Sequence, residues 1–180
     1  ITALAGAMSN VLELFSSNEV LRRISLWRMG GLDGADYSRV AVAAGIGMVV
    51  IAVLPRYATA LNAFLLGESE ARYLGIDVER TKTGIVLMVA IAVGTSVALA
   101  GTIAFVGLVV PHIIRLLIGP DHRYLLPASA IAGALLLISA DIIARTVIAP
   151  TELPVGIVTA CIGVPFFVSL LHRRREFGMQ

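Results

Sequence analysis

The chain has 180 residues, of which 58% are hydrophobic and 14% charged, and its formal net charge is +2. A soluble domain usually has about 45 to 50% apolar residues, so this composition and a mean hydropathy of +0.91 indicate an integral membrane protein. The small net charge is carried almost wholly by arginine, which argues against nucleic-acid binding and predicts loop charges that set membrane topology.

The first third of the chain predicts an incomplete span, an interfacial helix and a long span. The apolar run at 1–15 is too short to cross a hydrocarbon core of about 30 Å, and its abrupt start leads us to expect part of a longer polypeptide. At 16–39, charged and apolar residues at helical spacing surround Trp27, which is typical of an amphipathic interfacial helix followed by a turn. The apolar run at 40–54 predicts a span that continues to Phe64, because proline kinks a membrane helix more often than it ends it.

A charged segment at 66–82 interrupts the apolar sequence. Gly67 and Gly75 punctuate a short predicted helix from about Glu68 to Leu74, with acidic residues in its first turn as the helix dipole prefers. Asp77 is placed to cap a second short helix that runs into the next apolar run. The pattern fits either a surface that contacts a soluble partner or an ordinary connecting loop with local caps.

The remaining sequence predicts four further spans. No charged residue occurs between Lys82 and Arg115, a distance that fits two helices joined as a hairpin at Gly101–Thr102. The expected spans are 83–100, 102–117, 125–147 and 155–171, with turns at 119–123 and 150–154 and a stop at 172–175. The sequence therefore predicts an all-α, polytopic membrane helical bundle with about six transmembrane helices.

Loop charges orient this bundle. Nine basic residues lie on one side and five on the other, and the positive-inside rule places the richer side in the cytoplasm. The charged segment, the Asp121 loop and the carboxyl terminus are therefore predicted to be cytoplasmic. The nine residues are Arg56, Arg72, Arg80, Lys82, Arg115, Arg123 and Arg173 to Arg175.

Five motifs, which begin at Leu66, Ser96, Asp121, Ala140 and Glu152, follow one another at close spacing through nearly the whole chain. Together they resemble the FecCD family of permeases, the membrane subunits of ABC importers for ferric siderophores, haem and cobalamin. The resemblance implies a full-length fold of about ten transmembrane helices. The present sequence would be one permease domain over 1–180 that corresponds to the carboxyl-terminal six helices, starting in the fifth.

The resemblance also implies where partners bind. The segment at about 66–82 would be a cytoplasmic coupling segment that docks in a groove of an ATPase subunit, with an apolar face from Leu66, Ala71 and Leu74 inside a charged rim. Arg145 matches the position that pairs with an acidic residue of the periplasmic binding protein, and an ion pair with Asp141 at i, i+4 is a compatible alternative. The coupling residues would be Gly67, Glu68, Glu70, Ala71, Arg72, Leu74 and Gly75.

The implied assembly is a homodimer of permease subunits in the bacterial inner membrane, with two ATPase subunits that bind ATP and Mg²⁺ and a periplasmic substrate-binding protein. The chain has no Gly-x-x-x-x-Gly-Lys-Ser/Thr phosphate loop and no converging nucleophile or carboxylate pair, so we expect no catalytic residue, cofactor or metal in it. The translocation pathway would run between two permease copies, lined by Ala7, Met8, Val158, Ile162 and Phe166.

Several residues also admit other interpretations. His112 is a conceivable haem-iron ligand, but the Pro111-His112 pair belongs to the family pattern whatever the substrate, so local hydrogen bonding is preferred. Cys161 can form no internal disulfide and is expected to pack in the bundle. An ion-coupled secondary transporter would place ionisable residues at mid-membrane, whereas no acidic residue lies in the middle of a complete predicted span. Haem is preferred as substrate over ferric siderophore, with cobalamin third, on the sequences at 119–124 and 145–156.

Overall fold

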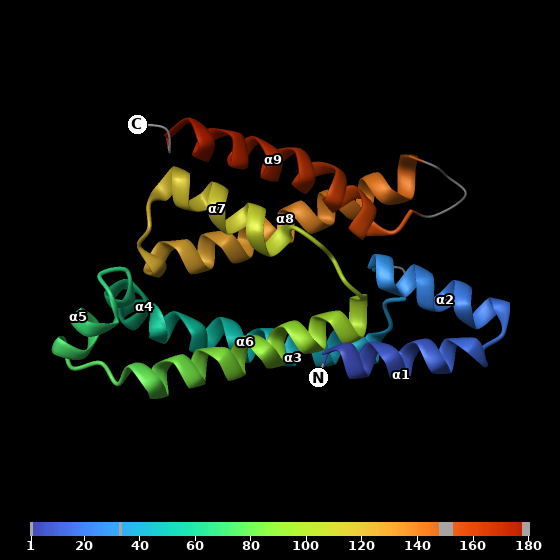
Figure 1. Cartoon of the computed structure of the whole chain (residues 1–180), viewed down its shortest axis with the longest axis horizontal. Coiled ribbons are helices and arrows are strands. Elements are labelled where there is room, and N and C mark those ends of the chain that lie inside the picture. Colours follow the sequence, from blue (N-terminus) through green and yellow to red (C-terminus); the bar gives the residue numbers. More distant parts are fainter. Residues whose placement is uncertain (1, 33, 148–152, 178–180) are drawn as a thin grey trace.

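The computed structural model describes residues 2–32, 34–147 and 153–177, and within these ranges every regular element is a helix (Figure 1). The all-α class predicted from the sequence is therefore confirmed. In chain order the elements are α1 (Thr2–Leu14), α2 (Asn18–Met29), α3 (Tyr37–Val53), the 3₁₀ turn η1 (Leu54–Tyr57), α4 (Ala58–Phe64), α5 (Glu68–Tyr73), α6 (Val78–Ala100), α7 (Val106–Ile118), α8 (His122–Val147) and α9 (Val155–Phe177).

Three helical stretches in the described residues are long and apolar enough to cross a membrane: Tyr37–Phe64, Val78–Ala100 and His122–Val147. The first continues through the proline of η1, as the sequence predicts. Proline has no N–H to donate, and the i→i+3 hydrogen bonding of the 3₁₀ turn keeps the chain helical at this point. Val106–Ile118 and Val155–Leu170 are apolar but shorter. A helix with the 13 residues of α7 rises only about 20 Å, less than the thickness of a hydrocarbon core.

The helices form two packets, which Figure 1 shows one above the other. In the first packet, α3 lies beside α6, and α4 and α5 close one end. In the second packet, α8 packs against both α7 and α9. The packets meet where α4 and η1 contact α8, at the left of Figure 1, and α2 contacts α9 at the right. Each packet is thus anchored to the rest of the chain near the ends of its helices.

Two predictions about helix boundaries are wrong. α6 ends at Ala100 as expected, but the next four residues are not helical and α7 packs in the second packet with α8 and α9 rather than as a hairpin with α6. Phe105, whose φ of 66° is left-handed, separates this link from α7. At the other end, α9 continues to Phe177 through the predicted stop at 172–175, because arginine is itself a good helix former. The turn predicted at 150–154 lies largely outside the described residues.

Three glycines, Gly30, Gly101 and Gly156, let the ends of α2 and α6 and the start of α9 meet backbone to backbone. The Gly156 N–H donates to the Gly30 carbonyl oxygen at 3.2 Å. A Cβ on Gly101 would lie 1.9 Å from the Trp27 carbonyl oxygen, and one on Gly156 would lie 1.8 Å from that of Met29. Non-bonded atoms cannot approach so closely, so a side chain at either position would push the segments apart. We call these three residues the glycine junction.

We expect Gly156→Ala to destabilise the protein, because the added methyl group must displace the backbone of α2. Overpacking typically costs about 1–3 kcal/mol, which corresponds to a fall of roughly 2–10 °C in apparent melting temperature for a chain of this size. Gly94→Ala in α6 is the matched control, since a Cβ there meets no atom within 4 Å. Thermal unfolding of the purified protein in lipid nanodiscs measures both. Equal melting temperatures for the two variants would contradict the close approach.

Candidate functional site

The segment predicted to couple to a partner is a short helix held on a buried base. Ala71 of α5 is fully buried, and it packs with Ala63 of α4 and Val78 of α6 in one apolar cluster. Because Ala71 is buried against α4 and α6, it cannot belong to the face offered to a partner. The prediction that Ala71 supplies part of that face is therefore wrong.

The exposed side of the same segment carries large apolar residues. Tyr73 is 91% exposed, and Leu65, Leu66 and Leu74 are also exposed. An exposed apolar patch rimmed by charges is typical of a protein interaction site. We call these four residues the α5 tip. Two of the predicted apolar residues, Leu66 and Leu74, are thus exposed to a partner, as are Tyr73 and Leu65.

The two glycines that flank α5 have backbone conformations that favour glycine. Gly67 has a φ of 118° and Gly75 a φ of 81°. A Cβ on Gly67 would also lie 2.4 Å from Glu70 Oε2, so the Glu70 carboxylate sits directly over this turn. The turns that the sequence predicted at both positions are therefore present, and they set α5 apart from α4 and α6 as a separate short helix.

Charged pairs surround α5 and tie it to the first turn of α6. Lys82 Nζ donates to Glu68 Oε1, and Arg72 lies 3.6 Å from Glu79. The hydrogen bond and the charge of Lys82 lower the pKa of Glu68 below its ordinary value, so this carboxylate is ionised at neutral pH. Its contribution to stability is lost only as the pH falls through that lowered pKa, which is well below the physiological range. Exposed pairs of this kind each contribute little, so the buried base fixes α5 more firmly than its charges do.

The cap predicted for the next helix is also present. Asp77 precedes α6, and its Oδ1 accepts a hydrogen bond from the Arg80 N–H at 3.1 Å. The segment after α5 is not a second short helix, however, because α6 runs without interruption to Ala100. α5 is therefore followed directly by a helix long enough to cross a membrane.

A polar contact that the sequence did not predict joins α4 to the start of α8. Asn62 Nδ2 donates to Asp121 Oδ1 at 2.7 Å, and the His122 N–H donates to Asn62 Oδ1 at 2.8 Å. Asp121 Oδ1 also accepts from the Arg123 N–H at 2.9 Å, as a helix cap does. These hydrogen bonds, together with nearby positive charge, lower the pKa of Asp121. The sequence signals the cap through Gly119-Pro-Asp, but nothing local points to Asn62, which lies 59 residues away.

At the far end of α8, Arg145 Nε donates to Asp141 Oδ2 at 2.8 Å. The i, i+4 pair predicted from the sequence is therefore present. Both side chains are partly exposed, 45% for Arg145 and 23% for Asp141, so the carboxylate holds the guanidinium in place without burying it. This end of α8 lies at the opposite end of the molecule from α5 (Figure 1).

The residues predicted to line a pathway do not come together within this chain. Ala7 and Met8 are exposed on α1, at the bottom of Figure 1, whereas the other three lie on α9 at the top. Phe166 of α9 makes an edge-on contact with the His112 ring, whose centroid is 5.8 Å away. Val158 packs against the apolar contact between α8 and α9, and Ile162 is exposed.

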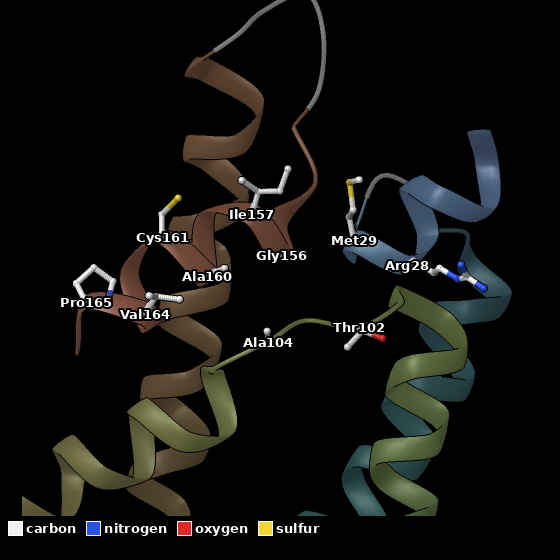
Figure 2. A pocket seen from close by; sticks show the side chains of 10 residues that line it. All are labelled: Arg28, Met29, Thr102, Ala104, Gly156, Ile157, Ala160, Cys161, Val164 and Pro165. Atoms are coloured by element: carbon white, nitrogen blue, oxygen red, sulfur yellow. The ribbon is translucent and has the colours of Figure 1, made fainter. Parts of the chain in front are cut away.

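An open apolar cleft of 670 Å³ lies beside the glycine junction (Figure 2). It separates the end of α2 and the link after α6 from the first half of α9. Cys161 lines it and is exposed, so this residue is not packed in a core as predicted. In the described residues, no three His, Cys, Asp or Glu side chains are grouped so as to hold a metal ion. The cleft is lined by Arg28, Met29, Thr102, Ala104, Gly156, Ile157, Ala160, Cys161, Val164 and Pro165.

Known proteins resemble this chain over most of its length. The FecCD transport family matches residues 1–173. The hemin transport system permease protein HmuU of Yersinia pestis is 46% identical over 98% of this chain and 53% of its own length. The cobalamin import system permease protein BtuC of Halobacterium salinarum is 44% identical over 97% of this chain and 46% of its own. The iron(3+)-hydroxamate import system permease protein FhuB of Bacillus subtilis is 44% identical over 88% of this chain and 41% of its own.

A solved structure of a metal-chelate type ABC transporter in an inward-facing conformation has the same fold. It superposes with a TM-score of 0.84 over 96% of this chain and 57% of that chain, at 29% sequence identity. The present chain therefore spans about half the length of the proteins that it matches.

Cysteine labelling tests the geometry of α5 directly. In a Cys161→Ser background, we expect Tyr73→Cys to react rapidly with a maleimide in membranes and Ala71→Cys to react at least about tenfold more slowly, because a buried thiol is reached only when α5 opens locally. Mass spectrometry of the labelled peptide measures both rates in intact vesicles. Similar rates at the two positions would show that α5 does not rest on Ala63 and Val78.

Proposed function

The chain belongs to the FecCD transport family, and from this premise we propose that it forms part of the permease subunit of an ATP-binding-cassette importer. The observation that carries the proposal is the α5 tip, an apolar surface rimmed by charges on a helix with a buried base. A soluble ATPase subunit would dock on this tip and bind ATP and Mg²⁺, and the permease itself would catalyse no reaction.

The orientation and assembly follow from the same proposal. α5, the turn between α7 and α8 and the end of α9 lie together at one end of the molecule (Figure 1), the end that carries most of the basic residues. The positive-inside rule supports a cytoplasmic position for this end, including the carboxyl terminus, in the bacterial inner membrane. Arg145 would then face the periplasm, where a substrate-binding protein docks.

The translocation pathway would form between two permease copies. A pathway between copies is consistent with the exposure of Ala7, Met8 and Ile162, which find no common cavity within one chain. Val158 and Phe166 would support that wall from behind, since they pack toward α8 and α7. Such weakly polar walls suit a bulky chelate that is passed along rather than held.

We propose haem as the substrate, ahead of ferric siderophore and cobalamin. The identity of 46% to a hemin permease supports haem as the first choice, and the cobalamin and hydroxamate permeases, each 44% identical, do not rank the other two. The experiment that separates the three is ATPase stimulation in proteoliposomes by binding protein loaded with each chelate in turn. Stimulation by haem-loaded protein alone supports the proposal, and a response only to another chelate replaces haem with that substrate.

The coupling role predicts a specific effect of Tyr73→Glu in the reconstituted transporter. A charge in place of the most exposed aromatic ring of the α5 tip should weaken docking of the ATPase and lower ATP-driven uptake by about tenfold or more, as loss of a hot-spot aromatic does. Tyr37→Glu is the matched control, because Tyr37 is 94% exposed at the opposite end of the first packet. Uptake and ATPase co-purification are measured together. Normal uptake in Tyr73→Glu would refute coupling through α5.

The docking role predicts that Arg145→Glu weakens binding-protein affinity more than Arg145→Ala does, because it sets like charges against each other. The difference should shrink in 1 M salt, where the Debye length falls to about 3 Å. Surface plasmon resonance at low and high salt measures both variants. An acid-to-arginine change on the binding protein should restore affinity to Arg145→Glu. Unchanged affinity at low salt would leave Arg145 as a partner of Asp141 only.

A further inference from the structure

The Asn62 side chain joins α4 to the start of α8. Its side chain amide donates to Asp121 Oδ1, and its Oδ1 accepts from the His122 N–H, with His122 Nδ1 also 2.8 Å from the same oxygen. The N–H donor and the oxygen acceptor of the amide therefore both bond to one segment, the cap of α8. Hydrogen bonds to a carboxylate are stronger than those between neutral groups, so this contact is among the firmer polar links between the two packets.

The neighbouring residue links the same short helix to the coupling segment. Ala63 packs against Ala71 of α5 and Val78 of α6 in a buried cluster. α4 has only seven residues, and its two contacts come from the adjacent residues Asn62 and Ala63. A displacement of α5 must therefore move α4, and the Asn62 contact transfers that movement to α8.

α8 extends from this contact to the opposite end of the molecule. Its 26 residues rise about 39 Å, and Arg145 and Asp141 lie near its far end. The helix packs against α7 and α9 along its length, so it moves with the second packet. The chain thus contains a continuous physical connection from α5 through α4 to the surface around Arg145.

We propose that Asn62, Asp121 and His122 form a clasp that transmits movement of α5 to α8, and that these three are positioning residues for the coupling of ATP hydrolysis to transport. The inference rests on the proposed function, since it assigns the clasp to the same coupling. If the clasp were only structural, its loss would lower stability without changing the ratio of ATP hydrolysed to substrate moved.

The test uses the full-length transporter in proteoliposomes. Asn62→Asp places a second carboxylate beside Asp121 and removes the amide donor, so we expect the ATP hydrolysed per substrate molecule to rise by about fivefold or more, the lower range of typical coupling energies. Combining it with Asp121→Asn restores the pairing with the roles exchanged, because asparagine also caps helices and can donate to the new carboxylate. The double variant should return the ratio toward the wild-type value. Asn18→Asp, at the exposed start of α2, is the matched control.

A second measurement separates this inference from the proposed function. Hydrogen exchange of the α4 and early α8 amides, read in nanodiscs without any ATPase, should rise in Asn62→Asp and fall again in the double variant. If folded Asn62→Asp hydrolyses as much ATP per substrate molecule as the wild type, the clasp is overturned. If the wild-type protein shows no ATP-driven uptake, the proposed function is overturned, but the hydrogen-exchange result on the clasp still holds. Should Asn62→Asp fail to assemble, Asn62→Ala carries the same test, because it removes both hydrogen bonds without adding a charge.

Discussion

The hydrocarbon core of a bilayer offers no water to the backbone, so each crossing segment must satisfy its N–H and C=O groups within a helix. This constraint accounts for the uninterrupted apolar helices α6 and α8 and for the way the chain passes Pro55 through a 3₁₀ turn without leaving the helical course. It also moves the polar contacts toward the helix ends. The Glu68–Lys82 pair and the Asn62 contact lie at one end, and the Arg145–Asp141 pair lies near the other.

The same solvent weakens the usual reason for helices to pack, since lipid tails are as apolar as leucine. Close backbone approach then becomes important, and the glycine junction is the clearest instance. Gly101 and Gly156 let carbonyl oxygens of α2 come within distances that any side chain would forbid. The buried alanines Ala140 and Ala144 serve the contact between α8 and α9 in a similar way, together with Val155. Small residues thus hold together helices that expose most of their apolar surface.

Patterns that act over a few residues made much of this fold predictable. The span through Pro55, the glycines around α5, the cap at Asp77 and the Asp141–Arg145 pair all depend on neighbours within one or two turns. The packing of α7 was not predictable, because an apolar run is equally suited to either packet. The burial of Ala71 was not predictable for a related reason, since alanine fits both a buried base and an exposed face. The Asn62 contact joins segments 59 residues apart, and no local periodicity encodes it.

The contrast between the two sides of α5 explains how one short helix could serve a moving partner. Toward the membrane its attachment is buried, through Ala71 on Ala63 and Val78, so it resists displacement relative to α4. Toward solvent it offers exposed apolar residues and charged pairs that are each individually weak. This asymmetry suits the proposed coupling role, because the exposed surface can bind and release a partner while the buried attachment passes its movement on to α4. In the proposed clasp, the hydrogen bonds of Asn62 join α4 to the start of α8, and α8 reaches the opposite end of the molecule.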